Sequence, residues 1–103
     1  FIRGNSHEPN TIRKVENEIP SHGLDVLFLD GDHTYKGVRK DFQDYKSHVA
    51  EDGLIVLHDI VETPFHPNCE VNKFWLELKE NYNTKEIINS PDQRWGGIGI
   101  VFL

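Results

Sequence analysis

The centre of the chain shows two kinds of hydrophobic pattern. Residues 24–30 (LDVLFLD) and 54–58 (LIVLH) are short apolar runs that end in polar residues, which is typical of strands buried on both faces. Between these runs, apolar residues recur at the helical spacings of four, three and four: Val38, Phe42, Tyr45 and Val49. A strand, a helix and a second strand predict a right-handed crossover between two parallel strands.

The N-terminal segment predicts a strand end and a short helix. Residues 1–4 (FIRG) resemble the last residues of a strand. A helix is expected to open at residues 8–11, with Asn10 or Thr11 as its cap. Its narrow apolar stripe consists of Ile12, Val15 and Ile19.

The C-terminal segment predicts one helix and two strands. Residues 70–82 form a strongly amphipathic pattern, residues 84–88 a short strand, and residues 97–103 a final buried strand. The connector between the two strands is too short for a parallel crossover, so the last strand is expected to run antiparallel. Residues 94–96 at its start are then expected near the acidic edge of the sheet.

Composition limits the classes of function. The chain has 103 residues, enough for one small domain with one core. A net charge of −6 without a Lys/Arg cluster argues against a nucleic-acid partner. A mean hydropathy of −0.55 fits a chain that does not enter a membrane. A single cysteine, Cys69, excludes an internal disulfide, argues against a thiolate zinc site, and fits the reducing cytoplasm. The start at Phe1 and the absence of Met lead us to expect part of a longer chain.

Acidic residues follow both central strands. Asp30 ends the first apolar run and Asp59 follows the second. The carboxyl ends of parallel strands meet at one edge of a sheet, where ligands bind. Neighbouring strands lie about 4.8 Å apart, so these carboxylates can share one divalent cation. His33 and His58 accompany them. The alternative, that each Asp only forms a turn or caps a helix, stays open.

Two segments near this edge have plainer interpretations. Residues 60–70 (IVETPFHPNCE) form a loop with two prolines, a candidate substrate wall to which His66 and Cys69 contribute polar groups. A simple surface loop explains the same composition. The helix after the first strand is expected to carry a solvated, mixed-charge outer face: Lys36, Arg39, Lys40, Asp41, Asp44 and Lys46.

Together, several phrases carry a family resemblance. The order of elements, the phrases LFLDGDHTY and GLIVLHDI, the Phe74–Trp75 pair and the RWGGIGI strand start resemble the C-terminal part of a class I S-adenosylmethionine-dependent methyltransferase. The closest likeness is to the bacterial methyltransferase domain 24 group, related to metal-dependent sugar and catechol O-methyltransferases. It covers essentially the whole chain. It implies an α/β fold, the C-terminal portion of a Rossmann-like sheet with strands 4-5-7-6, the last strand antiparallel, and helices on both faces.

The resemblance also implies roles for individual residues. His33 corresponds to a general base. Asp30, Asp59 and His58 correspond to the metal site, Mg²⁺ or another divalent cation, although His58 stands where some relatives carry Glu. Imidazole at that position favours softer ions. The residues expected to bind S-adenosylmethionine are Gly4, Asn5, Ser6, His7, Asp30 and Gly31.

The expected function is methyl transfer, with two alternatives. The resemblance implies metal-assisted O-methylation of a small-molecule or sugar hydroxyl in the cytoplasm. Residues 1–103 are expected to be a single partial domain that lacks the N-terminal cofactor-binding half, is inactive alone, and self-associates or pairs with that half. The alternatives are a metal-dependent hydrolase, for which the motifs have the wrong order and spacing, and a non-catalytic methyltransferase-like domain.

Overall fold

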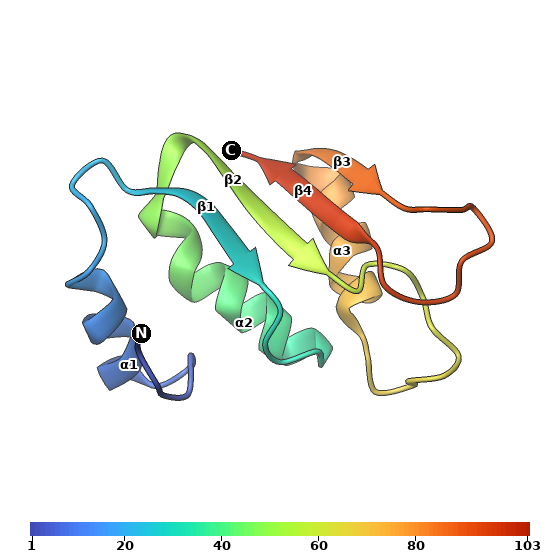
Figure 1. The fold of residues 1–103 in the computed structure, drawn as a ribbon, viewed down its shortest axis with the longest axis horizontal. Coiled ribbons are helices and arrows are strands. Elements are labelled where there is room, and N and C mark those ends of the chain that lie inside the picture. The colour runs from blue at the N-terminus through green and yellow to red at the C-terminus, as the bar shows by residue number, and fades with distance from the viewer.

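A computed structural model describes residues 1–103, which form three α-helices and four strands (Figure 1). The elements in chain order are α1 (Pro9–Glu16), β1 (Leu24–Leu29), α2 (Tyr35–Tyr45), the short 3₁₀ helix η1 (Lys46–His48), β2 (Val49–His58), α3 (Val71–Asn81), β3 (Asn83–Ile87) and β4 (Ile98–Phe102). No helix has both the length and the apolar character needed to cross a bilayer.

The four strands form one mixed sheet in the order β1-β2-β4-β3. β1 and β2 are parallel and are joined through α2, whereas β4 runs antiparallel to both β2 and β3. Figure 1 shows the heads of β1 and β2 pointing the same way, with β4 pointing back between β2 and β3. This arrangement confirms the expected α/β class, strand order and antiparallel last strand.

The core lies between the sheet and two helices on one of its faces. Ile55, Leu57 and Val101 are fully buried on this face, together with Trp75 of α3, which is 1% exposed. α2 and α3 pack against each other here, with the rings of Phe42 and Phe74 5.5 Å apart in an edge-to-face arrangement.

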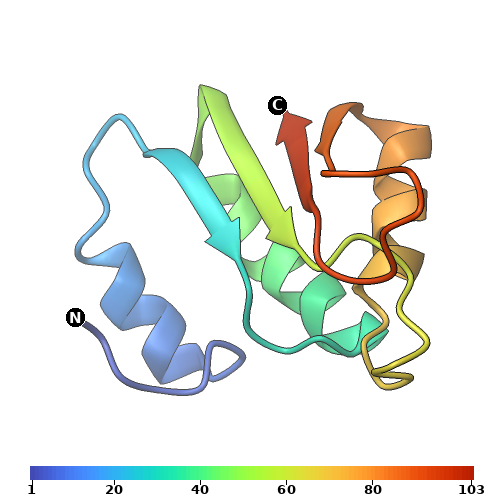
Figure 2. The ribbon, with the colours of Figure 1, turned by 45° about the vertical axis from the view of Figure 1, so that its right-hand side comes forward.

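The other face of the sheet has no helix over it, so the expectation of helices on both faces does not hold within residues 1–103. Figures 1 and 2 show α2 and α3 behind the sheet, with α1 beyond β1. α1 lies on the α2 side, where His48 Nε2, just after α2, is 3.4 Å from Glu16 Oε1. Alternation along the strands gives this uncovered face, the open sheet face, eight apolar residues: Val26, Phe28, Leu54, Val56, Ile87, Ile98, Ile100 and Phe102.

Three local expectations are corrected. Residues 1–4 form no strand, because no neighbouring strand offers them hydrogen bonds. α1 starts with Pro9 after Glu8, so Asn10 and Thr11 lie inside the helix rather than at its cap. Asp41 is not on a solvated face: it is 5% exposed and lies beneath the N-terminal loop.

Candidate functional site

Three loops meet beyond the carboxyl ends of β1 and β2. They are residues 30–34 after β1, residues 59–70 after β2 and residues 88–97 before β4 (Figure 1). The loops are tied together, since the Val61 N–H donates to the Gly96 carbonyl at 3.0 Å. Because β1 and β2 are hydrogen-bonded neighbours, the polar residues at their ends are held at adjacent positions.

Four of these residues form a closed cluster, which we call the His–Asp quartet: Asp30, His33, His58 and Asp59. Asp30 Oδ1 lies 3.1 Å from His33 Nε2 and 3.4 Å from His58 Nδ1. Asp59 Oδ2 lies 3.3 Å from His33 Nδ1 and 3.1 Å from His58 Nδ1. Each imidazole therefore touches both carboxylates. The structure brings the predicted base and the three predicted metal ligands into one site.

The backbone of Asp59 is adapted to this arrangement. Its φ is +59°, and it is the one non-glycine residue with positive φ. Asp is among the few residues that adopt this left-handed conformation. The turn at Asp59 follows β2 immediately, and its carboxylate, 21% exposed, faces the two histidines. The chain thus turns sharply directly after β2, and the turn directs the Asp59 carboxylate toward the two histidines.

The two ring nitrogens of His33 lie in different surroundings. Nε2 forms a hydrogen bond with Asp30 Oδ1 at 3.1 Å. Nδ1 lies 3.3 Å from Asp59 Oδ2 without the geometry of a hydrogen bond. A neutral imidazole that donates from Nε2 presents a lone pair at Nδ1.

A cavity of about 540 Å³ opens beside the quartet. Its wall contains His33, His58 and Asp59, and the loops add Thr63, Phe65, His66, Cys69 and Trp95. His66 and Cys69 line this cavity, and Trp95 places residues 94–96 near this edge, as expected. That the wall contacts a substrate stays a prediction. Burial, with a smaller contribution from the Asp59 carboxylate, raises the pKa of the Cys69 thiol above its usual value.

A two-bond clamp fixes the 60–70 loop against His33. The Glu70 N–H donates to the His33 carbonyl at 2.7 Å, and Glu70 Oε2 accepts from the Tyr35 N–H at 3.1 Å. The second bond satisfies a free amide at the start of α2. The residue before the clamp is Cys69, whose Sγ lies 3.9 Å from His33 Nδ1.

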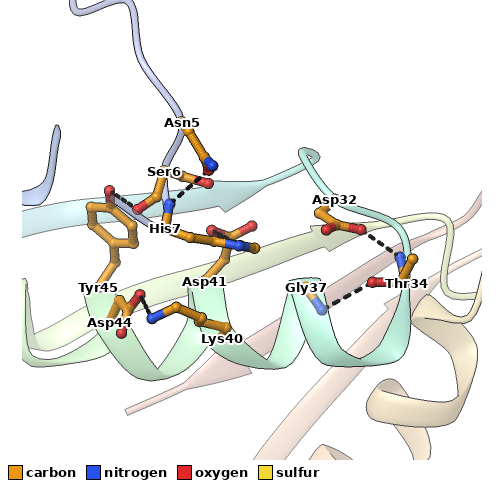
Figure 3. A network of polar contacts seen from close by, with 10 residues as sticks. All are labelled: Asn5, Ser6, His7, Asp32, Thr34, Gly37, Lys40, Asp41, Asp44 and Tyr45. Atoms are coloured by element: carbon orange, nitrogen blue, oxygen red, sulfur yellow. Dashed lines mark hydrogen bonds and ion pairs between the residues drawn. The ribbon is translucent and has the colours of Figure 1, made fainter. Parts of the chain in front are cut away.

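A second cavity of about 290 Å³ lies on the other side of Asp30. Four of the six residues predicted to bind S-adenosylmethionine line it: Gly4, Ser6, Asp30 and Gly31. Asn5 and His7 do not. The Asn5 side chain accepts from the His7 N–H at 3.0 Å, which shapes the loop instead (Figure 3).

His7 lies next to the buried Asp41, which also lines this second cavity. His7 Nε2 and Asp41 Oδ1 are 3.1 Å apart, but their orientation gives neither atom a hydrogen bond (Figure 3). Asp41 Oδ1 is therefore a buried carboxylate oxygen without a hydrogen-bond donor, and such atoms are rare in proteins. The Tyr45 hydroxyl donates to the Ser6 carbonyl at 2.8 Å and closes the same wall.

Two residues of the site were missed or undervalued in the sequence. The charge of Asp41 favours a solvated position, but its spacing of three from Val38 and four from Tyr45 places it on the buried stripe of α2. Cys69 was set aside as a metal ligand because it has no second cysteine. Its proximity to His33, 36 residues away, has no local signal.

Comparisons with known proteins give the family. A family model described as a methyltransferase domain matches residues 1–60. An uncharacterized protein of Acanthamoeba polyphaga mimivirus is 37% identical over 60 residues, which is 56% of this chain and 27% of the viral protein. The chain thus spans about a quarter of the length of that curated relative. The matched residues contain β1, α2 and β2 with all four members of the quartet. The chain belongs to the methyltransferase domain family, of the class I S-adenosylmethionine-dependent type.

Proposed function

We propose that the protein transfers a methyl group from S-adenosylmethionine to a hydroxyl oxygen of a small-molecule or glycan acceptor, with assistance from a divalent cation. The observation that supports this most is the position of His33, which contacts Asp30 and Asp59 and lines the cavity of about 540 Å³. At the carboxyl edge of a methyltransferase sheet, an acceptor hydroxyl needs to lose its proton, and a base at this edge can take it.

His33 is the proposed general base. Asp30 accepts the Nε2–H and sets the ring tautomer, which leaves Nδ1 to take a proton from the acceptor. Asp30 lies between the two cavities: it lines the smaller one and contacts His33 and His58, which line the larger one. A methyl donor in the first and an acceptor in the second would therefore approach each other beside Asp30.

The donor set suits a divalent cation. Ligand atoms of Asp30, His58 and Asp59 all lie within 4.8 Å of one another. Two carboxylates and one imidazole fit Mn²⁺, Fe²⁺ or Zn²⁺ better than Mg²⁺, which takes oxygen ligands. Such a cation, when bound, supplies positive charge that lowers the pKa of a coordinated hydroxyl. The residues themselves hold it and orient one another.

The smaller cavity suits part of S-adenosylmethionine. Gly31 leaves room for close approach of a flat ring, and Asp41, which also lines this cavity, offers a carboxylate that can accept from an exocyclic amine. When bound, the cofactor supplies an electrophilic methyl group. At about 290 Å³ the cavity holds one part of such a molecule, so the rest is expected to contact other segments of the active protein.

A first experiment tests the base. In the active protein, His33→Gln is expected to lower the single-turnover rate of methyl transfer by about 10² to 10⁴, with cofactor affinity nearly unchanged. The loss should shrink from about pH 6 to about pH 9, because an acceptor that ionises by itself needs the base less. Parallel loss of melting temperature and cofactor binding would assign His33 a structural role instead.

A second experiment tests the cation. Calorimetric titration with Mn²⁺ and Mg²⁺ should detect a site that Asp59→Ala abolishes, with Mn²⁺ bound more tightly. Asp25, an exposed carboxylate on β1 and outside the quartet, provides the matched control Asp25→Ala. Binding that is unchanged in Asp59→Ala would remove the shared-cation model, and transfer that survives chelation would leave His33 as the main catalytic group.

A further inference from the structure

Cys69 gives the site a second set of metal-binding atoms. The donors of His33, Asp59 and Cys69 lie within 4.8 Å of one another, and this set shares only Asp59 with the set formed by Asp30, His58 and Asp59. We propose that His33, Asp59 and Cys69 form a zinc site that removes His33 from catalysis when it is filled. Binding of zinc here does not depend on the proposed methyl transfer; only the inhibition rests on that function.

The distances fit tetrahedral coordination. With Zn–S near 2.3 Å and Zn–N and Zn–O near 2.1 Å, tetrahedral angles separate S and N by about 3.6 Å and N and O by about 3.4 Å. The structure has 3.9 Å between Cys69 Sγ and His33 Nδ1 and 3.3 Å between that nitrogen and Asp59 Oδ2. These two separations differ from the tetrahedral values by a few tenths of an ångström, and the third pair, Cys69 with Asp59, lies within 4.8 Å. The adjoining cavity leaves room for a water molecule as fourth ligand.

The surroundings of His33 also match a metal ligand. Histidines that bind a metal through one nitrogen almost always donate the other N–H to a carboxylate or carbonyl oxygen. With Nδ1 on the ion, Nε2–H points at Asp30 Oδ1, 3.1 Å away. Nδ1 lies 3.3 Å from Asp59 Oδ2 without a hydrogen bond between them, so an ion held by these two atoms displaces no hydrogen bond. The Glu70 clamp holds the sulfur on the required side of His33.

The two donor sets differ in the ions that they favour. A thiolate, an imidazole and a carboxylate are typical zinc ligands, whereas magnesium avoids sulfur. The sets also differ in their effect on His33. In the set with Asp30 and His58, His33 Nδ1 stays available for a proton, but in the set with Cys69 that nitrogen is coordinated. Zinc also fits the set with Asp30 and His58, so the expected inhibition by zinc is the part that depends on the Cys69 thiol, and magnesium should not cause it.

Cobalt provides a test that needs no activity. Titrating the protein with Co²⁺ should produce a thiolate-to-cobalt charge-transfer absorption in the near ultraviolet and intense tetrahedral bands in the visible. Zn²⁺ should abolish both, and excess Mg²⁺ should not. Cys69→Ser should lose the charge-transfer absorption, while His66→Ala, which changes another residue of the same wall, should keep it. Cobalt binding without charge transfer in the wild-type protein would overturn the proposal.

Alkylation of the thiol tests the site without any variant. Cys69 is the only cysteine, so the rate of thiol alkylation reports on it alone. Zinc at 100 times its Kd should slow alkylation by about 100-fold, since only the metal-free protein reacts. The same excess of Mg²⁺ should have no effect. A thiol that stays equally reactive at saturating zinc would exclude the site.

Activity then tests the consequence. In the active enzyme, zinc should inhibit the wild type more strongly than Cys69→Ser, each measured relative to its own rate without zinc. If the cobalt and alkylation results support the site but zinc does not inhibit, the zinc site stands and the role of His33 as base is overturned. If the spectroscopic signature is absent, the zinc site fails and the proposed function is unaffected.

Discussion

The backbones of Glu70 and His33 are hydrogen-bonded: the Glu70 N–H donates to the His33 carbonyl at 2.7 Å. The Glu70 carboxylate also accepts from the Tyr35 N–H, and its hydrogen bonds, first from Lys73 and then from Tyr35, hold its pKa below the usual range. Glu70→Ala should lower the melting temperature and weaken cobalt binding at Cys69, because the α2 start loses its acceptor and only the backbone bond still holds the loop. Glu70→Gln keeps an acceptor oxygen, so it should keep most of the cobalt affinity. Equal losses in both variants would assign the effect to charge alone.

The positive φ of Asp59 predicts a separation of stability from metal binding. Asp59→Ala and Asp59→Gly both remove the carboxylate, so both should lose the cation. They should differ in stability, because alanine at a φ of +59° costs about 1–2 kcal/mol more than glycine. Urea unfolding of the two variants, with metal titration beside it, measures both effects. Equal stability would mean that the turn relaxes when the carboxylate is removed.

The contact between Gly99 and Trp75 predicts a strict size limit near the start of β4. A Cβ at Gly99 would lie 2.5 Å from the Trp75 ring. Gly99→Ala should therefore destabilise the fold by about 1–3 kcal/mol through overpacking. In a Trp75→Leu background the same change should cost less, because the atoms that it meets are gone. A double-mutant cycle by chemical denaturation measures this coupling, and additive effects would contradict a direct clash.

Glu86 predicts a loss of stability in acid. Its hydrogen bonds from Lys79 at 2.8 Å and from the Trp75 indole at 2.6 Å lower its pKa below 4.5. A carboxylate with a lowered pKa stabilises the fold fully above its unfolded pKa, and this contribution disappears as pH falls through the folded pKa. Glu86→Gln should therefore cost roughly 1 kcal/mol or less at neutral pH, after solvent screening, and less at an acidic pH, as the carboxylate becomes protonated in the folded protein. Urea unfolding at the two pH values tests this; a constant difference would exclude linkage to Glu86.

The open sheet face predicts self-association of residues 1–103 in solution. Phe28, 54% exposed, lies on this face beside an unpaired sheet edge, and large exposed apolar surfaces associate. Phe28→Gln should lower the weight-average mass in sedimentation equilibrium. Leu76 of α3 is equally exposed, at 56%, but is not on this face. Leu76→Gln should leave the mass unchanged, and a matching decrease in both variants would point to nonspecific aggregation.

The sequence alone determined the strand–helix–strand unit and the edge at which its polar residues meet. The periodicities of residues 24–60 indicate which residues face a core. Because crossovers are right-handed, only one arrangement of the two parallel strands and the helix between them remains. From these local rules, Asp30, His33, His58 and Asp59 were expected in one site, and the structure brings them together.

Only the tertiary structure decided what lies around that site. Cys69 reaches His33 through the Glu70 clamp, a pairing across 36 residues that no local pattern encodes. Asp41 is buried because a distant loop covers it, and residues 1–4 form no strand because strand hydrogen bonds require a neighbour. Periodicity states that a face is buried but not what buries it. α2 and α3 share one face of the sheet because Phe42 and Phe74 pack together, which leaves the other face open.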